Sequence, residues 1–551
     1  MTPPADSQPS ANDTYTSPLA ARNASAEMLR LWSPRHKFNT WRRIWLAVAE
    51  AQYEVTKDWG SDESQRAPTI REGSSKREPL PHGHGSSGPL VTLEQVEELR
   101  AVVERGITDA EIARAGELER ELRHDVMAHV HCLGEACPKA KGIIHLGCTS
   151  QDVVCNADLN IIQKSIPLIC SKLQNVVYVL GACAQGHKDI PTLGFTHYQT
   201  AQPTTVGRRC ANWAYDLIQS QNWWNGQPNT LTWPVKYRGL RGATGTQASF
   251  LELFDGNANC VDALEERFMR LFLNGPLTFG KPVEDDERGL QATYYHYTHR
   301  LTGQTYPRVV DTEILSSLAS VAAVLHKIAT DIRLLSNRKE IDEPFGDKQI
   351  GSSAMPYKRN PMRCERICGL TRFVMNLVGN AYDTAATQWL ERTLDDSSNR
   401  RLSLPESFLA LDGALDLMHN VASGLVVNEA MVRKNLMLEL PFLATENILM
   451  EAVKAGGDRQ DLHERIRVHA QEAGHRVKQL GLDNDLLDRL RGDPAFEAVK
   501  DRLTDGDLLD PMKYVGRSVE QTERFIAEVI EPLRERYKDE LKAMGDSEPR
   551  V

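Results

Sequence analysis

The chain has 551 residues, of which 41% are hydrophobic and 25% are charged. This composition is that of an ordinary globular protein, and it excludes a wholly disordered, fibrous or membrane-embedded chain. The 65 Lys and Arg against 75 Asp and Glu give a net charge of −10. No overall positive field would hold a nucleic acid or an anionic membrane surface, so we expect neither as a partner.

The first residues, MTPPADSQPS, have neither the basic start nor the apolar stretch of a secretion signal. No uninterrupted apolar run of about 18 residues follows, which argues against a membrane span. All ten cysteines lie between Cys132 and Cys368 and form no CxxC pair, which fits neither a disulfide scaffold nor a zinc ribbon. We therefore expect reduced thiols and a cytoplasmic location.

Two terminal stretches and one internal stretch lack the pattern of a packed core. We expect residues 1–15 and the tail from Gly545 to be unstructured. Half of residues 60–89 are Gly, Ser or Pro, which predicts a flexible insertion. Its His82 and His84 have no Cys or carboxylate neighbours at ligand spacing, so we predict no metal site there.

Helical signals dominate the rest of the chain. Thr92 and Gln95 have the spacing of a capping box, which predicts a helix beginning there. Apolar residues recur at steps of three and four in residues 159–180, 314–335 and 367–377, which predicts long bundle helices. Stripes of this length usually need partners beyond their own domain, so we expect oligomerisation through these helices.

Strand signals are sparse, and we predict a mostly α fold of three domains with a long central helical bundle. At about 150 residues a domain, the length allows three or four. We place an N-terminal helical domain at residues 16–149, the central bundle at 150–427 and a C-terminal helical domain at 428–551.

A polar stretch, GSSAMPYKRNP at residues 351–361, interrupts the helical pattern between two long helices. Asn360 as N-cap and Pro361 at the first helical position would open the next helix, whose free N–H groups attract anions. The segment 358–372 carries a net charge of +4, from Lys358, Arg359, Arg363, Arg366 and Arg372 against Glu365. A small polyanion is the natural ligand. A solvated connector between charged helix faces fits the same residues.

This stretch resembles the signature loop of the fumarase/aspartase superfamily of lyases, and its MPYKRNP form resembles the adenylosuccinate lyase family. HLGCTSQD at residues 145–152 and GFTHYQTAQPTTVG at 194–207 resemble two further superfamily regions in the expected order. The resemblance runs from about Ser17 to the last long helices and leaves out residues 60–89. It implies the three-domain fumarase/aspartase-like fold, a homotetramer with shared active sites, small-molecule nucleotide substrates and no cofactor.

The residues of these regions admit a structural and a catalytic interpretation. Thr149 and Ser150 offer hydroxyls and helix N–H groups to a carboxylate, although a plain N-cap fits as well. His197 stands in a polar run with Thr196 and is a plausible proton donor, although a lone histidine is more often a structural hydrogen-bonder. The resemblance makes His197 the general acid and places Thr149, Ser150 and Thr196 at the substrate.

Two more stretches face the substrate by resemblance. His124 and Asp125 match one of them, and Gln247 matches a residue that hydrogen-bonds a substrate carboxylate. The glycines around Gln247 fit neither a Walker A loop nor GxGxxG after a strand. His124, His129 and His131 lack the i, i+4 spacing of a helical zinc pair, so we predict no metal there.

The phosphate end of the substrate is assigned by resemblance alone. Arg392, Ser397 and Arg401 match the positions that hold a nucleotide phosphate, although the charges of residues 392–401 also fit a solvated helix face. Arg22 matches a residue that touches the same phosphate, and Asn23 stands where the family has tyrosine.

The resemblance implies β-elimination of fumarate from adenylosuccinate, giving AMP, and from the succinyl-carboxamide ribotide SAICAR, giving AICAR. Ser352 would be the base, Lys358 and Asn360 would support the carbanion and the bound carboxylate, and Glu365 would orient the loop and His197. From the residues alone we would nominate a histidine as the base. Two alternatives stay open: another fumarate-releasing lyase such as argininosuccinate lyase, and a catalytically silent scaffold member.

Overall fold

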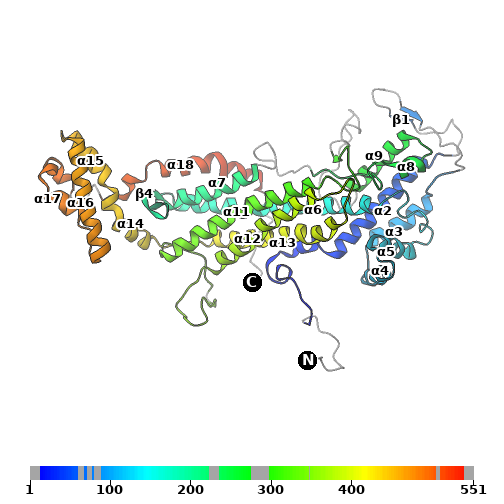
Figure 1. Cartoon of the computed structure of the whole chain (residues 1–551), viewed down its shortest axis with the longest axis horizontal. Helices are drawn as coiled ribbons and strands as arrows, with labels where there is room; N and C mark the ends of the chain where they lie inside the picture. Colours follow the sequence, from blue (N-terminus) through cyan, green and yellow to red (C-terminus); the bar gives the residue numbers. More distant parts are fainter. Residues whose placement is uncertain are drawn as a thin grey trace.

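The computed structural model describes residues 13–59, 68–70, 77–79, 88–222, 235–274, 297–346, 348–503 and 509–538. Within these ranges the molecule is elongated and built around a bundle of long helices (Figure 1). The bundle consists of α6 (Ser150–Gly186), α7 (Val206–Asn222), α11 (Val309–Asn337), α12 (Met362–Ala386) and α13 (Asp395–Ser423). The strands of the described residues form three two-stranded antiparallel pairs. The predicted mostly α fold is therefore confirmed.

The predicted apolar stripes line the interior of this bundle. Leu159, Leu325 and Ile367 are fully buried. By length and composition alone α6 and α11 could also cross a membrane, although 61% and 50% of their most apolar windows are buried inside the molecule. A helix at the centre of a bundle can be as long and as apolar as a membrane span, because its inward faces are apolar.

One end of the bundle carries the N-terminal helices (Figure 1). The capping box predicted at Thr92 is confirmed, because the Thr92 Oγ1 accepts the Gln95 N–H at 3.3 Å and the Gln95 Oε1 accepts the Thr92 N–H at 3.0 Å. The helices at this end are α3 (Leu93–Arg105), α4 (Asp109–Leu122) and α5 (Asp125–Ala136), joined by α8 (Ala248–Leu253) and α9 (Ala258–Asn274) from later in the chain. The chain reaches this end through α2 (Pro34–Thr56) from the π-helical turn η2 (Leu19–Asn23) and α1 (Ala26–Leu31), which contact α13. Helix α2 joins this end to the bundle through its contacts with α6 and α9.

The opposite end carries a hairpin and a smaller helical unit. The hairpin of β3 (Pro191–Thr196) and β4 (Gln199–Thr205) lies against α14. The unit has its own apolar core, in which Ile448, Leu490 and Phe496 are buried. Its elements are α14 (Glu429–Leu443), α15 (Thr445–Lys454), α16 (Arg459–Leu480), α17 (Leu486–Gly492), η4 (Pro494–Leu503) and η5 (Pro511–Tyr514). The boundaries proposed for the three domains stay a prediction.

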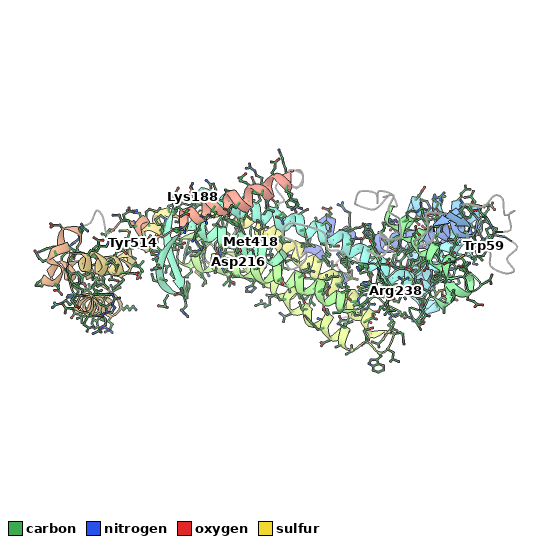
Figure 2. All side chains as sticks on the ribbon, turned by 90° about the horizontal axis from the view of Figure 1, so that it is seen from above. Trp59, Lys188, Asp216, Arg238, Met418 and Tyr514 are labelled. Atoms are coloured by element: carbon green, nitrogen blue, oxygen red, sulfur yellow. The ribbon has the colours of Figure 1, made fainter. Side chains whose placement is uncertain are left out.

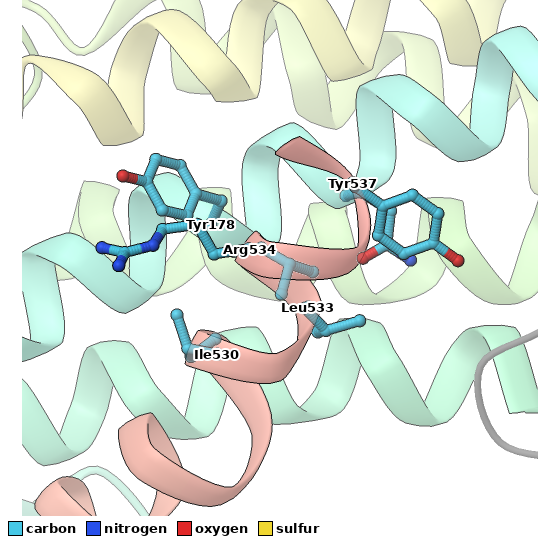
Figure 3. A pocket seen from close by; sticks show the side chains of 7 residues that line it. Tyr178, Ile530, Leu533, Arg534 and Tyr537 are labelled. Carbon is cyan, nitrogen blue, oxygen red and sulfur yellow. The ribbon is translucent and has the colours of Figure 1, made fainter. Parts of the chain in front are cut away.

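The last helices return along the bundle: α18 (Ser518–Phe525), η6 (Ile526–Ile530) and α19 (Glu531–Arg536). Ile530, Leu533 and Tyr537 lie over α6 beside Tyr178 (Figure 3). A short pair, β5 (Ile341–Asp342) with β6 (Val426–Val427), ties the end of α11 to the end of α13.

Part of the predicted flexible insertion is described. Within residues 60–89, β1 (Pro68–Ile70) and β2 (Arg77–Pro79) pair antiparallel. His82 and His84 lie outside the described residues, as do residues 1–12 and the tail from Gly545.

A buried ion pair attaches the glycine-rich turn at residues 238–247 to the first turn of α6. Asp152 and Arg238 are fully buried and joined as an ion pair. The same carboxylate oxygen of Asp152 accepts the N–H groups of Arg241 at 2.8 Å and Gly242 at 3.1 Å. One negative charge therefore fixes both the arginine and the backbone of the turn.

We expect Asp152→Asn to lower the free energy of unfolding by about 3–5 kcal/mol, because it leaves the buried Arg238 charge without a counter-charge. Asp461→Asn is the control, because its ion pair with Arg465 is exposed and screened by water, so its removal should change the free energy of unfolding far less. Urea denaturation of the two variants measures both. If both variants lost the same free energy of unfolding, burial of the ion pair between Asp152 and Arg238 would not explain its contribution to stability.

A second buried cluster joins α6 to α13. The Lys172 Nζ lies 2.5 Å from the Asp412 Oδ1 and 2.8 Å from the Asp416 Oδ2. Burial raises the pKa of Asp416 to about 6, the Lys172 charge opposes that shift, and Asp412 adds to it. The folded chain therefore favours the protonated form of Asp416, so its contribution to stability is greatest at low pH and is lost as the pH rises through 6.

Between pH 5 and pH 8 we expect the wild-type chain to lose about 1 kcal/mol of unfolding free energy that Asp416→Asn retains, since asparagine does not ionise. The measurement is urea denaturation of both proteins at the two pH values. A difference between the proteins that stays constant with pH would contradict the raised pKa.

Candidate active site

The predicted site residues fall into three groups in the folded chain. The first group lies where α5, α6 and α13 begin. His124 is the N-cap of α5, and its Nδ1 accepts the Met127 N–H at 3.3 Å. In the neutral ring the hydrogen is then on Nε2, which lies 3.4 Å from the Ser150 Oγ. Asp125 forms an ion pair with Arg401 of α13. Three elements far apart in sequence thus bring His124, Asp125, Ser150 and Arg401 together.

The electrostatics of this group keep its carboxylate charged. Burial alone would raise the pKa of Asp125, but the Arg401 guanidinium and the Val126 N–H outweigh it and hold the pKa below its usual value. Lys37 is a cation near this group that sequence reasoning missed. Burial lowers its pKa against the opposing charge of Asp158, and its Nζ lies 4.8 Å from the centre of the Trp41 ring. The signal in the sequence was the Lys37 and Trp41 pair at i, i+4 spacing.

Arg392 is held inside the protein. Its guanidinium donates to the Gln304 Oε1 at 2.9 Å and to the Asp396 Oδ1 at 3.3 Å, and its side chain is only 12% exposed. Asp396 is in turn paired with the buried Arg308 at 2.6 Å. Ser397 follows in the first turn of α13, on the same face as Arg401 one turn later. A phosphate contact by Arg392 stays a prediction. The two bonds use two of the five N–H donors of the guanidinium.

Thr149 and Gln247 have structural partners. Thr149 is the N-cap of α6, and its N–H donates to the Asp152 carboxylate at 2.8 Å. The amide of Gln247 donates to the Leu240 carbonyl at 2.9 Å and to the Glu265 carboxylate at 3.1 Å. These bonds use both hydrogens of the amide, so the predicted contact with a substrate carboxylate requires one of them to be released.

The second group is the turn of the β3–β4 hairpin. Thr196 ends β3, and His197 and Tyr198 follow with φ of +53° and +56°, as in the tight turns that join twisted strands. All three residues are exposed. The Arg338 guanidinium at the end of α11 lies 4.8 Å from the centre of the Phe195 ring, which holds the hairpin against the bundle.

The third group is the signature loop before α12. The Asn360 amide donates to the Gly351 carbonyl at 2.8 Å and closes the base of the loop. A side chain at Gly351 would meet the Lys358 carbonyl oxygen at 2.2 Å, so only glycine fits there. The Ser352 Oγ accepts the Met355 N–H at 3.1 Å. Lys358 is exposed.

The predicted start of the next helix is wrong. α12 begins at Met362, and the Asn360 side chain is bound to Gly351 instead of capping the helix. The N–H groups of Arg363 and Cys364 donate to the buried Glu343 carboxylate at 3.0 and 2.9 Å. A full negative charge satisfies a helix N-terminus better than an amide does. These N–H groups are therefore not free to bind an anion.

Two more residues of the third group lie on the first turns of α12. Glu365 is half exposed and lies 3.9 Å from the Arg333 guanidinium. Burial lowers the pKa of Arg366, and the nearby charges of Arg22 and Arg363 lower it further. Arg22 and Asn23 belong to η2, which packs on α13, the neighbour of α12 in the bundle.

Helix lengths separate the first group from the other two. The 37 residues of α6 span about 55 Å, with Ser150 at one end and the hairpin of His197 following the other. Figure 2 shows this separation, since Arg238 beside the first turn of α6 and Lys188 beyond its last turn lie far apart. The 25 residues of α12 likewise place the signature loop about 37 Å from Arg392. A single chain, as far as the structure describes it, does not bring Ser352 or His197 to the first group.

Comparisons with known proteins point to one family. The family described as "Lyase" matches residues 97–226 and 294–376, and "Adenylosuccinate lyase C-terminus" matches residues 441–525. The chain is 43% identical to adenylosuccinate lyase of Saccharomyces cerevisiae, over 96% of the chain and 98% of that protein. It is 44% identical to that of Schizosaccharomyces pombe, over 93% and 94%.

A solved structure shares the fold. The fumarate lyase from Mesorhizobium sp. BNC1 has a TM-score of 0.67 at 20% identity, covering 92% of this chain and 98% of that one. Identity this low speaks for the fold alone, whereas the two yeast relatives match nearly the whole chain. The chain belongs to the adenylosuccinate lyase family.

Proposed function

We propose that the chain eliminates fumarate from adenylosuccinate to give AMP, and from SAICAR to give AICAR, in cytoplasmic purine biosynthesis. The observation that carries the proposal is the meeting of His124, Ser150 and Arg401 at the ends of three helices. These groups suit a substrate with carboxylates and a phosphate. The yeast relatives named adenylosuccinate lyase support the choice of substrate.

The proposed chemistry needs a base, an acid and cations around the carbanion. Ser352 removes the proton beside a substrate carboxylate, Lys358 and Asn360 support the resulting charge, and Glu365 orients the loop. His197 protonates the departing nitrogen as the C–N bond breaks. The N–H of Met355, which donates to the Ser352 Oγ, supplies the stabilisation of the alkoxide that the occupied N-terminus of α12 does not.

We further propose a homotetramer whose active sites combine residues of different subunits. Helix lengths keep both His197 and Ser352 away from the first group within one chain, so a complete site needs other copies. Large apolar side chains stand exposed between α12 and α13, where a neighbouring helix would cover them: Trp389, Leu390 and Leu394. The number of subunits rests on the resemblance to the superfamily.

Ser352→Ala and His197→Ala should each lower turnover of adenylosuccinate by about two to four orders of magnitude with the assembly intact. Ser353→Ala is the matched control, because it removes the neighbouring hydroxyl and should leave turnover near the wild-type value. Absorbance change during fumarate release measures all three, and size-exclusion chromatography checks assembly. Near-normal turnover of Ser352→Ala or His197→Ala would refute its role. Turnover of argininosuccinate instead of adenylosuccinate would refute the substrate.

Mixing the two inactive variants tests whether sites are shared. If Ser352 and His197 of one site come from different subunits, random exchange of equal amounts should restore about a quarter of wild-type activity, because each residue is intact with probability one half. Subunits are exchanged by brief denaturation and refolding, and wild-type chain treated alike sets the reference. If both residues come from the same subunit, the mixture stays inactive.

A further inference from the structure

The N-terminal segment that carries Arg22 lies directly on the middle of α13. A side chain at Gly413 would meet the backbone oxygen of Asn23 at 2.6 Å, so the glycine leaves the space that the segment occupies. The Asn23 amide donates to the Pro18 carbonyl at 3.0 Å and closes the turn η2 on itself. Helix α13 therefore has a notch, formed by the missing side chain of Gly413, into which η2 fits.

A buried carboxylate beside this notch holds the same segment. The Asp412 Oδ2 accepts the backbone N–H of Ser25 at 2.6 Å, and Asp412 is fully buried. Its other oxygen lies 2.5 Å from the Lys172 ammonium of α6. The lysine thus fixes the orientation of the carboxylate, and the carboxylate fixes a backbone position three residues after Arg22.

The anchored segment brings two cations together. Arg22 is exposed, and its segment packs on α13, which lies against α12, the helix that carries Arg366 in its first turns. The charge of Arg22 helps to lower the pKa of Arg366. Two like charges repel each other, so their approach needs an anchor or an anion between them. Neither Asp412 nor Lys172 lies in the group that contains His124, so the mechanism above does not use them.

We propose that Asp412, oriented by Lys172, is a positioning residue that holds Arg22 beside Arg366 to receive the phosphate of the substrate, with Gly413 providing the space. This inference rests on the proposed function for the identity of the anion. The anchor itself is a property of the fold and can be measured without substrate.

Three variants separate the anchor from its surroundings. Asp412→Asn removes the charge that is oriented by Lys172 and weakens the bond to Ser25. Gly413→Ala pushes the segment away without changing any charge, and alanine suits a helix better than glycine. Asp416→Asn is the matched control, because it also takes a carboxylate from Lys172 but does not touch the segment.

The full-length assembled protein is used for two measurements. Hydrogen exchange of residues 17–25 should be faster in Asp412→Asn and Gly413→Ala and unchanged in Asp416→Asn. KM for adenylosuccinate should rise about tenfold in the first two variants, with kcat within about threefold, because phosphate binding is lost equally from substrate and transition state. Arg22→Ala should raise KM by a similar factor. The double variant Arg22→Ala with Asp412→Asn should have the same KM as Arg22→Ala alone.

Each contrary result identifies what fails. Unchanged exchange in both Asp412→Asn and Gly413→Ala overturns the anchor, whatever the activity. The anchor is also overturned if Asp416→Asn and Asp412→Asn change hydrogen exchange and KM equally, because both changes would then follow from the loss of a carboxylate beside Lys172. If hydrogen exchange is faster but the rise in KM of the double variant combines the rises of the two single variants, Asp412 does not act through Arg22. In all of these cases, release of fumarate by the wild-type chain supports the proposed function. If the wild-type chain releases no fumarate, the proposed function is refuted, and the hydrogen-exchange result still tests the anchor.

Discussion

The fixed rise of the α-helix is the constraint on which the arrangement of this molecule depends. Each residue of α6, α11, α12 or α13 advances the chain by about 1.5 Å, and the apolar faces of these helices pack against one another in one core. Residues at the ends of one helix are therefore separated by tens of ångströms. The same packing brings residues from distant parts of the sequence together where helices begin side by side, as at Asp125, Ser150 and Arg401.

Buried charges attach the irregular segments to this frame. Asp152 holds the glycine-rich turn, Asp396 holds Arg308 and Arg392, and Asp412 holds the N-terminal segment. In each case a carboxylate on a bundle helix is paired with a cation. A buried charge without its partner is costly, so such pairs favour one arrangement of the loop over its alternatives. These ion pairs therefore fix segments that have no apolar face of their own in one position on the bundle.

Several polar groups that look available in the sequence are already bound in the folded chain. The N–H groups at the start of α12 are taken by Glu343, the amide hydrogens of Gln247 by Leu240 and Glu265, and two of the N–H donors of Arg392 by Gln304 and Asp396. Their partners lie at least 18 residues away in sequence, with the exception of Leu240 and Asp396. A residue pattern identifies a donor, but it does not show which distant acceptor folding brings to it.

The sequence by itself determined the helical class, the apolar stripes of the long helices, the capping box at Thr92 and the family, because periodicity, capping and motifs are local properties of the chain. Only the tertiary structure decided that Glu343 caps α12, that Lys37 lies near Asp125, and that Asp412 reaches Ser25 across 387 residues. Those contacts depend on how helices of given length pack side by side, and local pattern carries no record of that packing.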